Sequence, residues 1–530
     1  MLKDSKPVAS SASRILVLSF WCFVLVYGAM LLYHPAFGVI DDHQFMTTLR
    51  VGRWVPPFII PVSGRFVPLL AAEFNILSLL STSATAFYLF NALEVAAVAW
   101  LLVRTAQLAP ARRYPAAPYI ATLFVLLTPA FAMAYLRLWV QEKNELFVLA
   151  AFLLTYLTLR ETGKLRYAGT CLVLGSIVLY TKETGFVPVA AVGFFGLWLD
   201  YRPASLPHPQ QRRIWRALHV SLLLSCTAFL LTYYFLVYRH KGPVLYGSKP
   251  GGRLQQHLHA LSADALHEPL LLGLFCLLAV LIFARKRSVA PPVKVLLLSG
   301  LAIILAYVAL GFANAYYLLP AYFVVPYLVT AALETQSLAQ YLRRPALLGI
   351  AAGVCAIQLV VVVQEYTFWR IGSTNFQAIL PSLEQQLQGP QRVNLFLDGV
   401  GSGSGLEVFD SLVEYLQAGG VAATKYDLMS NLSTAGKINF NPASPPPFYY
   451  QRITTAGIPR PGDLLLVTPF AAEPYRNKFA DHSQYALLSR TDSWSYTNFS
   501  VKTLLRRALH QPLGVDAVID PNYELYRKLP

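Results

Sequence analysis

Long apolar runs recur between residues 14 and 364, and they constrain the fold of this chain more than any other feature. A helix needs about 20 apolar residues to cross a bilayer, whereas a transmembrane strand needs about 10 in an alternating pattern. Hydrophobic residues occupy 55% of the 530 positions and charged residues only 13%. This composition excludes an ordinary soluble globular protein and predicts an α-helical polytopic membrane protein.

The runs divide into about eleven predicted transmembrane helices. Residues 1–13 form a short polar tail, and the first span is expected within 14–37, where no Ala-x-Ala cleavage pattern follows it. The remaining spans are expected over 85–103, 115–136, 145–159, 167–180, 186–199, 217–237, 269–284, 295–312, 317–333 and 346–364.

Lysine and arginine concentrate in the N-terminal tail and in every second connection between the predicted spans. By the positive-inside rule these segments are expected in the cytoplasm, which places the N-terminus there and the long loop 38–84 outside. Topology therefore accounts for most of the net charge of +16, and no nucleic-acid partner is expected. The five cysteines all lie in apolar runs, which argues against a disulfide framework or a zinc site.

The tail 365–530 loses the apolar runs and is expected to form a small extracytoplasmic α/β domain. Strand-like segments at 393–397 and 463–468 flank a helix-like segment at 406–417. The glycine-rich segment 398–405 joins strand to helix and could bind an anion. Its spacing does not match the dinucleotide-binding pattern, so a plain turn is the favoured interpretation.

Ionisable residues gather at the predicted outer ends of the spans, where burial makes charge costly. They are Asp41, Asp42, Arg137, Glu142, Lys143, Lys182, Glu183, Arg239, His240 and Lys241, together with the polar but uncharged Gln141. Because all of them reach the same aqueous face, one outward-facing cavity could collect them. A carboxylate there can deprotonate a hydroxyl or hold a divalent cation, while lysine and arginine can stabilise a phosphate leaving group. The alternative for each basic residue is an interfacial anchor or an ion-pair partner.

Four segments carry a resemblance to a known family. They are Asp41-Asp42 after the first span, Gly64-Arg65-Phe66-Val67-Pro68 in the outer loop, Tyr180-Thr-Lys182-Glu183-Thr-Gly185, and Tyr316-Tyr-Leu-Leu-Pro320. In their order and placement the chain resembles the GT-C superfamily of polytopic glycosyltransferases, in the branch of the protein mannosyltransferases and aminoarabinose transferases. The resemblance covers most of residues 14–364.

The resemblance implies a bacterial inner-membrane glycosyltransferase with a polyprenyl-phosphate sugar as donor and an envelope glycan, lipid or protein as acceptor. It implies inversion at the anomeric carbon, with Asp41 or Asp42 as general base or as ligand of Mg²⁺ or Mn²⁺, and Asp41 is slightly favoured as the base. Arg65, Lys182 and Tyr317 would shape the donor site, with Arg137 beside them and Glu183 fixing Lys182. Tyr316 stands where many relatives have an arginine, so Arg239 and Lys241 are candidates to supply that phosphate contact.

Two rival functions stay open at this point. A transporter or flippase of a lipid-linked or phosphorylated precursor could use the same outer charges, although clear internal repetition and deeply placed charges are missing from the sequence. A glycan-binding receptor or scaffold could act through residues 365–530.

The loop 238–269 could form a lid, and its His257 and His259 are interpreted as solvated rather than metal-binding. Asn431-Leu-Ser433 and Asn498-Phe-Ser500 match the glycosylation pattern, which usually carries no meaning in a bacterial protein.

Overall fold

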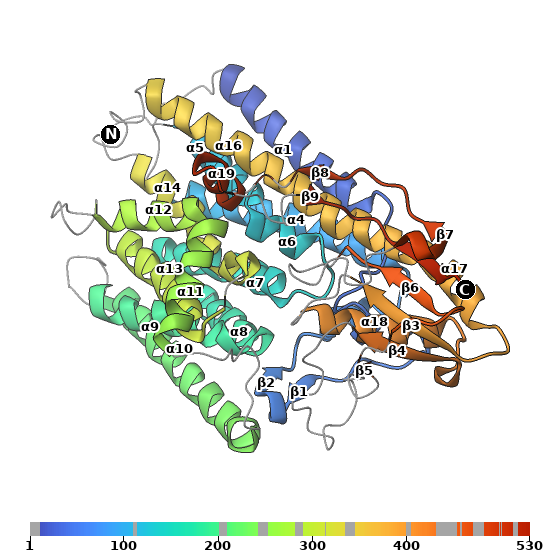
Figure 1. The fold of residues 1–530 in the computed structure, drawn as a ribbon. Helices are drawn as coiled ribbons and strands as arrows, with labels where there is room; N and C mark the ends of the chain where they lie inside the picture. The colour runs from blue at the N-terminus through green and yellow to red at the C-terminus, as the bar shows by residue number, and fades with distance from the viewer. Residues whose placement is uncertain are drawn as a thin grey trace.

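Apolar helices form one bundle, and a six-stranded sheet with its own helices lies at one end of it (Figure 1). The computed structural model describes residues 11–530 except 110–113, 201–208, 242–252, 281–289, 313, 334–344, 399–403, 431–452, 456–457, 470–481, 498, 500 and 512–517.

Helices of the bundle overlap the predicted spans, apart from α11, which lies in the predicted loop 238–269. They are α1 (Ser11–Leu32), α4 (Ala84–Gln107), α5 (Ala117–Leu126), α6 (Pro129–Tyr135), α7 (Gln141–Thr162), α8 (Leu165–Thr181), α9 (Phe186–Asp200), α10 (Pro209–Leu236), α11 (Arg253–His267), α12 (Pro269–Ala279), α13 (Pro291–Leu310), η6 (Ala315–Val324), α14 (Val325–Leu333) and α16 (Pro345–Tyr366). By length and composition, the described part contains five helices able to cross a membrane, or up to seven if each bent pair counts as one span. The prediction of a helical polytopic membrane protein is confirmed.

Two pairs of consecutive helices are bent, and the Glu268 carboxylate at one bend accepts a hydrogen bond from the backbone at the other. Helices α5 and α6 meet at 62° where Thr128 caps α6 before Pro129, and α11 and α12 meet at 100°. Glu268, at the second bend, accepts hydrogen bonds from the backbone N–H of Ala130 (2.6 Å) and from the hydroxyl of Tyr322 (2.5 Å). A backbone donor freed by the first break is thus satisfied inside the bundle, as a broken span requires.

The outer loop 38–84 is ordered, as expected, and packs against the bundle. It contains α2 (His43–Arg50), an antiparallel hairpin of β1 (Phe58–Ile60) and β2 (Arg65–Val67) around η1 (Pro61–Ser63), and α3 (Ala72–Ser78). Helix α3 begins only at Ala72, because Val67 pairs with Phe58 in the hairpin. Stacked rings of Phe45, Phe74 and Trp139, with centroids 4.1–5.4 Å apart, form the core beneath the loop.

The C-terminal part is an α/β domain, as predicted. Its strands are β3 (Val393–Asp398), β4 (Tyr426–Ser430), β5 (Ile453–Thr455), β6 (Leu464–Val467), β7 (Tyr485–Arg490) and β10 (Glu524–Lys528), in the order β5-β4-β3-β6-β10-β7. The first four are parallel, and β10 runs antiparallel to β6 and β7. The remaining elements are α18 (Ser404–Ala418), η8 (Ala423–Lys425), η10 (His482–Gln484), α19 (Val501–Ala508) and the small pair β8 (Tyr496–Thr497) and β9 (Val518–Ile519).

The chain passes from the bundle into this domain without leaving helical conformation. Helix α16 continues through the π-helical segment η7 (Thr367–Ile371) into α17 (Gly372–Leu387), so the predicted boundary at residue 364 lies inside a continuous helix. The π segment places Arg370, which is 1% exposed, at the C-terminal end of α1. Its guanidinium donates to the carbonyls of Leu31 and Tyr33 (both 3.2 Å) and lies 3.9 Å from the ring centre of Tyr88. A cation there complements the negative end of the helix dipole and fixes the direction in which the chain leaves α1.

Candidate active site

The Asp41-Asp42 turn has an uncommon backbone conformation. Asp41 has φ +68°, in the left-handed region that residues other than glycine seldom adopt. Asp42 occupies the N-cap position of α2, but its carboxylate turns back and accepts a hydrogen bond from the backbone N–H of Gly38 at 2.7 Å. Strained turns of this kind persist where the surroundings hold them, and they concentrate at functional sites.

Arg137 meets this turn from the connection between α6 and α7. Its Nη2 donates to Asp41 Oδ2 at 2.5 Å, and its guanidinium lies 4.4 Å from the ring centre of Trp369 and 5.5 Å from that of Tyr316. A cation between two aromatic rings and a carboxylate is held in one orientation. The sequence-based expectation had placed Arg137 and Asp41 on one face, and the structure brings them into contact.

Side chains on one face of α4 donate hydrogen bonds to the backbone carbonyls around Arg137. The hydroxyl of Tyr88 donates to the carbonyl of Leu136 (3.2 Å), and Asn91 Nδ2 donates to the carbonyls of Tyr135 (3.1 Å) and Arg137 (3.3 Å). Asn91 Oδ1 in turn accepts from the ammonium of Lys143 at 2.6 Å. Because residues three apart on a helix share a face, Tyr88 and Asn91 act on the same connection.

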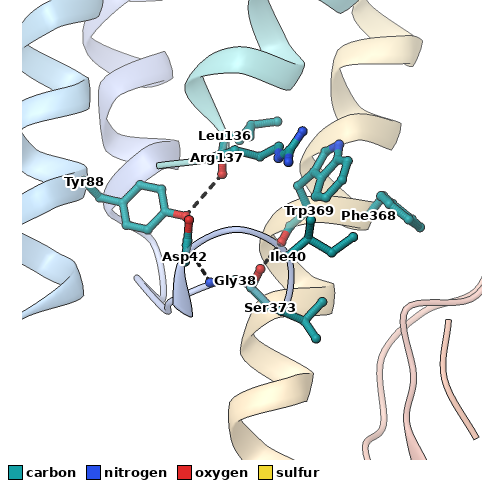
Figure 2. A pocket seen from close by; sticks show the side chains of 10 residues that line it. Gly38, Ile40, Asp42, Tyr88, Leu136, Arg137, Phe368, Trp369 and Ser373 are labelled. Carbon is teal, nitrogen blue, oxygen red and sulfur yellow. Dashed lines mark hydrogen bonds between the residues drawn. The ribbon is translucent and has the colours of Figure 1, made fainter. Parts of the chain in front are cut away.

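Asp42 and Arg137 line a narrow cleft between the first outer loop, α4 and the helix after α16 (Figure 2). The other lining residues are Gly38, Val39, Ile40, Tyr88, Leu136, Phe368, Trp369 and Ser373. The cavity volume of about 10 Å³ is close to that of one water molecule. A ligand larger than one water molecule therefore enters this cleft only after its walls move apart.

Burial raises the basicity of both carboxylates. It raises the pKa of Asp42, which is 2% exposed, to about 6, although the backbone N–H groups of Gly38 and Trp139 and the charge of Arg137 lower it. Burial also raises the pKa of Asp41, against the opposing charges of Arg137 and Arg65. A carboxyl group with a pKa near 6 is a better general base at neutral pH than an exposed aspartate.

Arg65 and Glu183 form a second charged group beside the first. Arg65 Nε lies 3.3 Å from Glu183 Oε1, and that oxygen also accepts from the backbone N–H of Phe66 at 2.9 Å. Glu183 opens η2 (Glu183–Gly185), so the hairpin strand β2 is bonded to the segment that follows the C-terminal end of α8. Since Arg65 also lowers the pKa of Asp41, the two groups act on each other electrostatically.

Lys182 pairs with a different carboxylate from the one expected. Its Nζ forms a buried ion pair with Glu142 in the first turn of α7, whereas the sequence-based expectation was that Glu183 fixes it. The reason is that Lys182 has an extended backbone between α8 and η2, and its buried side chain meets the α7 N-terminus. The ring centre of Tyr317 lies 4.4 Å from Lys182 Nζ.

Arg239 lies in η4 (Tyr238–His240) and Lys241 follows it, and η4 packs against η1 in the hairpin that carries Arg65. Arg239 is exposed and lies 5.7 Å from the ring centre of Phe235, and Lys241 Nζ lies 3.8 Å from that of Tyr238. Neither lines the Asp42 cleft.

The carboxylates do not fit a metal site in this arrangement. Across the described ranges, no group of three histidine, cysteine or acidic side chains is placed to hold an ion. Arg137 already neutralises Asp41, and a backbone N–H binds Asp42, so the donor set fits a base better than a pair of ligands. His257 bonds instead through Nδ1 with the carbonyl of Val308 at 3.1 Å.

Several sequence features lie wholly or partly outside the described residues. They are the glycine-rich segment at 399–403, the loop part 242–252, the first glycosylation pattern at 431–433, and residues 498 and 500 of the second.

Sequence reasoning missed the supporting residues Asn91, Arg370 and Tyr415. Asn91 carried no signal beyond being polar within an apolar run, and Arg370 and Tyr415 belong to segments assigned to the tail. Glu142 and Lys143 were placed in the outer cluster without a role. Their use as partners of Lys182 and Asn91 depends on helix packing that the sequence does not display.

Comparison with known proteins gives structural matches only. No family model and no curated protein sequence matches the chain. Two solved structures of ArnT from Cupriavidus metallidurans do match it, each at 14% identity. The structure bound to undecaprenyl phosphate has a TM-score of 0.50 and covers 96% of this chain and 97% of its own. The apo structure has a TM-score of 0.49, with 90% and 97% covered.

The chain has the ArnT fold. The match confirms the predicted fold class, a helical polytopic membrane protein with a C-terminal α/β domain. At this identity the match to ArnT describes the fold and not the role of any residue.

Proposed function

We propose that this protein is a membrane glycosyltransferase that moves a sugar from a polyprenyl-phosphate carrier to a hydroxyl of an extracytoplasmic glycan, lipid or protein. The observation that carries the proposal is the Asp42 carboxylate in a cleft beside Arg137, with Arg65 and Lys182 close by in an ArnT-like fold. One of the matching ArnT structures is bound to undecaprenyl phosphate, which supports a carrier of this class here.

In the proposed reaction the acceptor oxygen attacks the anomeric carbon and the bond from that carbon to the phosphate oxygen breaks. The acceptor proton passes to a carboxylate, and the polyprenyl phosphate leaves with the bonding electrons. The attack is in line, so the anomeric configuration inverts.

Asp42 is proposed as the base in preference to Asp41, which reverses the order favoured from the sequence. Asp42 lines the cleft, and burial raises its pKa to about 6, whereas Asp41 is held in an ion pair with Arg137. An ion-paired carboxylate accepts a proton less readily, so Asp41 is better suited to orient Arg137.

Arg65 and Lys182 are proposed to bind the donor phosphate, and Tyr317 supports Lys182. Each basic group is neutralised by a glutamate, Glu183 or Glu142, so a phosphate would compete with that glutamate. Charge-assisted hydrogen bonds of this kind stabilise a leaving phosphate more in the transition state than in the ground state. Arg239 and Lys241 do not line the Asp42 cleft, and they are proposed as candidates for a further phosphate contact because η4 packs against η1 beside the Arg65 hairpin.

The proposal also includes the orientation of the protein in the membrane. The cleft and the C-terminal domain face the extracytoplasmic side of a bacterial inner membrane, and the N-terminus faces the cytoplasm, as the distribution of basic residues predicts.

The test uses protein in nanodiscs with a panel of undecaprenyl-phosphate hexoses and pentoses and an envelope glycan extract as acceptor. Mass spectrometry should find a new glycoside together with released undecaprenyl phosphate. Asp42→Asn should abolish the product and Asp41→Asn should reduce it. Translocation of the labelled lipid without any product would instead establish the transporter alternative. Full transfer by a folded Asp42→Asn variant would refute the proposed base.

A further inference from the structure

The C-terminal domain makes direct hydrogen bonds to the segment that carries Asp42. Helix α18 packs on α2, and the hydroxyl of Tyr415 on α18 donates to the carbonyl of Gly38 at 2.9 Å. The backbone N–H of the same Gly38 donates to Asp42 Oδ2 at 2.7 Å (Figure 2). Gly38 thus links the hydroxyl of Tyr415 to the carboxylate of Asp42, although Tyr415 and Gly38 are 377 positions apart in the chain.

A second contact holds the other side of the turn. Ser411, one helical turn before Tyr415, lies with its Oγ 2.6 Å from Nδ1 of His43, the residue after Asp42. Both residues are buried, with 0% of Ser411 and 4% of His43 exposed. Residues four apart on α18 thus bind the chain on both sides of the two aspartates.

The continuation of α16 adds a third contact. Gln377 Nε2 on α17 donates to the carbonyl of Phe37 at 3.1 Å. That carbonyl and the N–H of Gly38 belong to one peptide group, so its oxygen is held by α17 while its N–H binds Asp42. A hydrogen bond to the oxygen of a peptide group polarises its N–H and strengthens the bond that the N–H makes.

These contacts matter because the turn is strained. Asp41 has a positive φ, and such conformations persist only where their surroundings hold them. The membrane bundle supplies Arg137 and Arg370 on one side. The C-terminal domain supplies contacts on the other side, so the turn lies between the two parts of the protein.

We infer that Tyr415 and Ser411 are positioning residues, through which the C-terminal domain holds the Asp42 carboxylate in its reactive orientation. The domain is then part of the catalytic apparatus and not only a cap on the outer face. The inference rests on the proposed function for its catalytic consequence, but the structural contact itself can be tested without activity.

The structure offers a matched control for removal of the Tyr415 hydroxyl. Tyr523 is fully buried in the same domain, and its ring contacts the same Phe376 ring that Tyr415 contacts, with centroids 5.7 and 5.1 Å away. Its hydroxyl has no hydrogen-bond partner within the part of the chain that the structure describes. Tyr415→Phe and Tyr523→Phe therefore make the same chemical change, but only the first removes a bond to the turn.

The first measurement is hydrogen exchange by mass spectrometry on the full chain in nanodiscs. Tyr415→Phe and Ser411→Ala should each speed exchange in peptides covering residues 36–46, on the order of tenfold for loss of one hydrogen bond. Exchange in the sheet strands β3 and β6 should stay unchanged, which shows that the domain is folded. Tyr523→Phe should match the wild type throughout. Unchanged exchange at 36–46 in both α18 variants would refute the inference, whatever the protein catalyses.

The second measurement is the transfer reaction with the donor and acceptor found active in the panel. Tyr415→Phe should lower kcat about tenfold and change KM for the donor less than about twofold, because the base and not the phosphate contact is displaced. A variant with faster exchange at 36–46 and an unchanged kcat would show that the contact has no catalytic role. Failure of the wild type to transfer any sugar would refute the proposed function, while the exchange result would still decide whether the domain holds the turn.

Discussion

Arg137 Nη2 donates to Asp41 Oδ2 over 2.5 Å, although the two residues are 96 positions apart in the chain. Both side chains are largely buried, with 11% of Arg137 and 20% of Asp41 exposed. Breaking such a pair by removing one partner leaves the other charge poorly solvated. The pair therefore links the connection after α6 to the Asp41-Asp42 turn and is expected to be energetically coupled.

A double-mutant cycle with Arg137→Gln and Asp41→Asn should show this coupling. Each single substitution should destabilise the protein, and the double variant should lose less than the sum, with a coupling of about 0.5–3 kcal/mol. The measurement is the free energy of unfolding by detergent titration in mixed micelles. The exposed pair Arg392–Asp427 is the control, for which about 0–1 kcal/mol is expected. Equal coupling in the two cycles would contradict a special role for the Arg137–Asp41 pair.

The pH dependence of transfer should report Asp42. Burial raises the pKa of Asp42 to about 6, and a general base works in its ionised form. The rate should therefore rise with pH through an apparent pKa near 6 and level off above it. The profile of kcat/KM between pH 4.5 and 8.5 measures this directly. Asp41→Asn removes a neighbouring negative charge that raises this pKa, so the rising limb should persist and move to lower pH. A flat wild-type profile over this range would argue against Asp42 as the base.

Gly38→Ala should disturb the carboxylate at short range. A Cβ on Gly38 would lie 3.2 Å from Asp42 Oδ2 and 3.4 Å from Ser373 Oγ, which is tighter than ordinary contact. We expect transfer to fall on the order of tenfold with little change in overall fold. Gly169→Ala in α8 is the control, because a Cβ there meets nothing within 4 Å and alanine favours a helix. Equal activity of the two variants would show that the turn tolerates this displacement.

Binding of undecaprenyl phosphate should depend on Lys182. Loss of a charge-assisted contact costs about 1.5–3 kcal/mol, so Lys182→Gln should weaken binding by roughly tenfold to a hundredfold. Native mass spectrometry of the protein titrated with undecaprenyl phosphate measures the change. Lys164→Gln, at an exposed position before α8, should bind like the wild type. Glu142→Gln should bind more tightly if the phosphate competes with Glu142 for Lys182, and weaker binding would show that Glu142 holds Lys182 in place for the donor.

Much of the architecture could be predicted because hydropathy is a local property. Each predicted span overlaps a helix or a pair of helices, although only five to seven of the described helices are long and apolar enough to cross a membrane. The strands β3 and β6 and the helix α18 lie where their residue patterns place them. The exact start of α3 was not predictable, because Val67 joins a strand whose partner, Phe58, is nine positions away. The predicted domain boundary at residue 364 falls inside the continuous helix from α16 to α17. The boundary was placed where the apolar content of the sequence falls, but the backbone stays helical beyond that residue.

The sequence by itself determined that this chain is a helical membrane protein, and it placed Asp41, Asp42, Arg137 and Lys182 near helix ends and Arg65 in the loop 38–84. These conclusions follow from transfer free energies and charge, which each segment carries regardless of its neighbours. Only the tertiary structure decided that Glu142 pairs with Lys182, that Arg137 pairs with Asp41, and that Tyr415 and Ser411 hold the turn from the C-terminal domain. Those pairings join segments up to 377 positions apart. They depend on how helices pack, and packing reflects the shape of the whole chain rather than the preference of any one stretch.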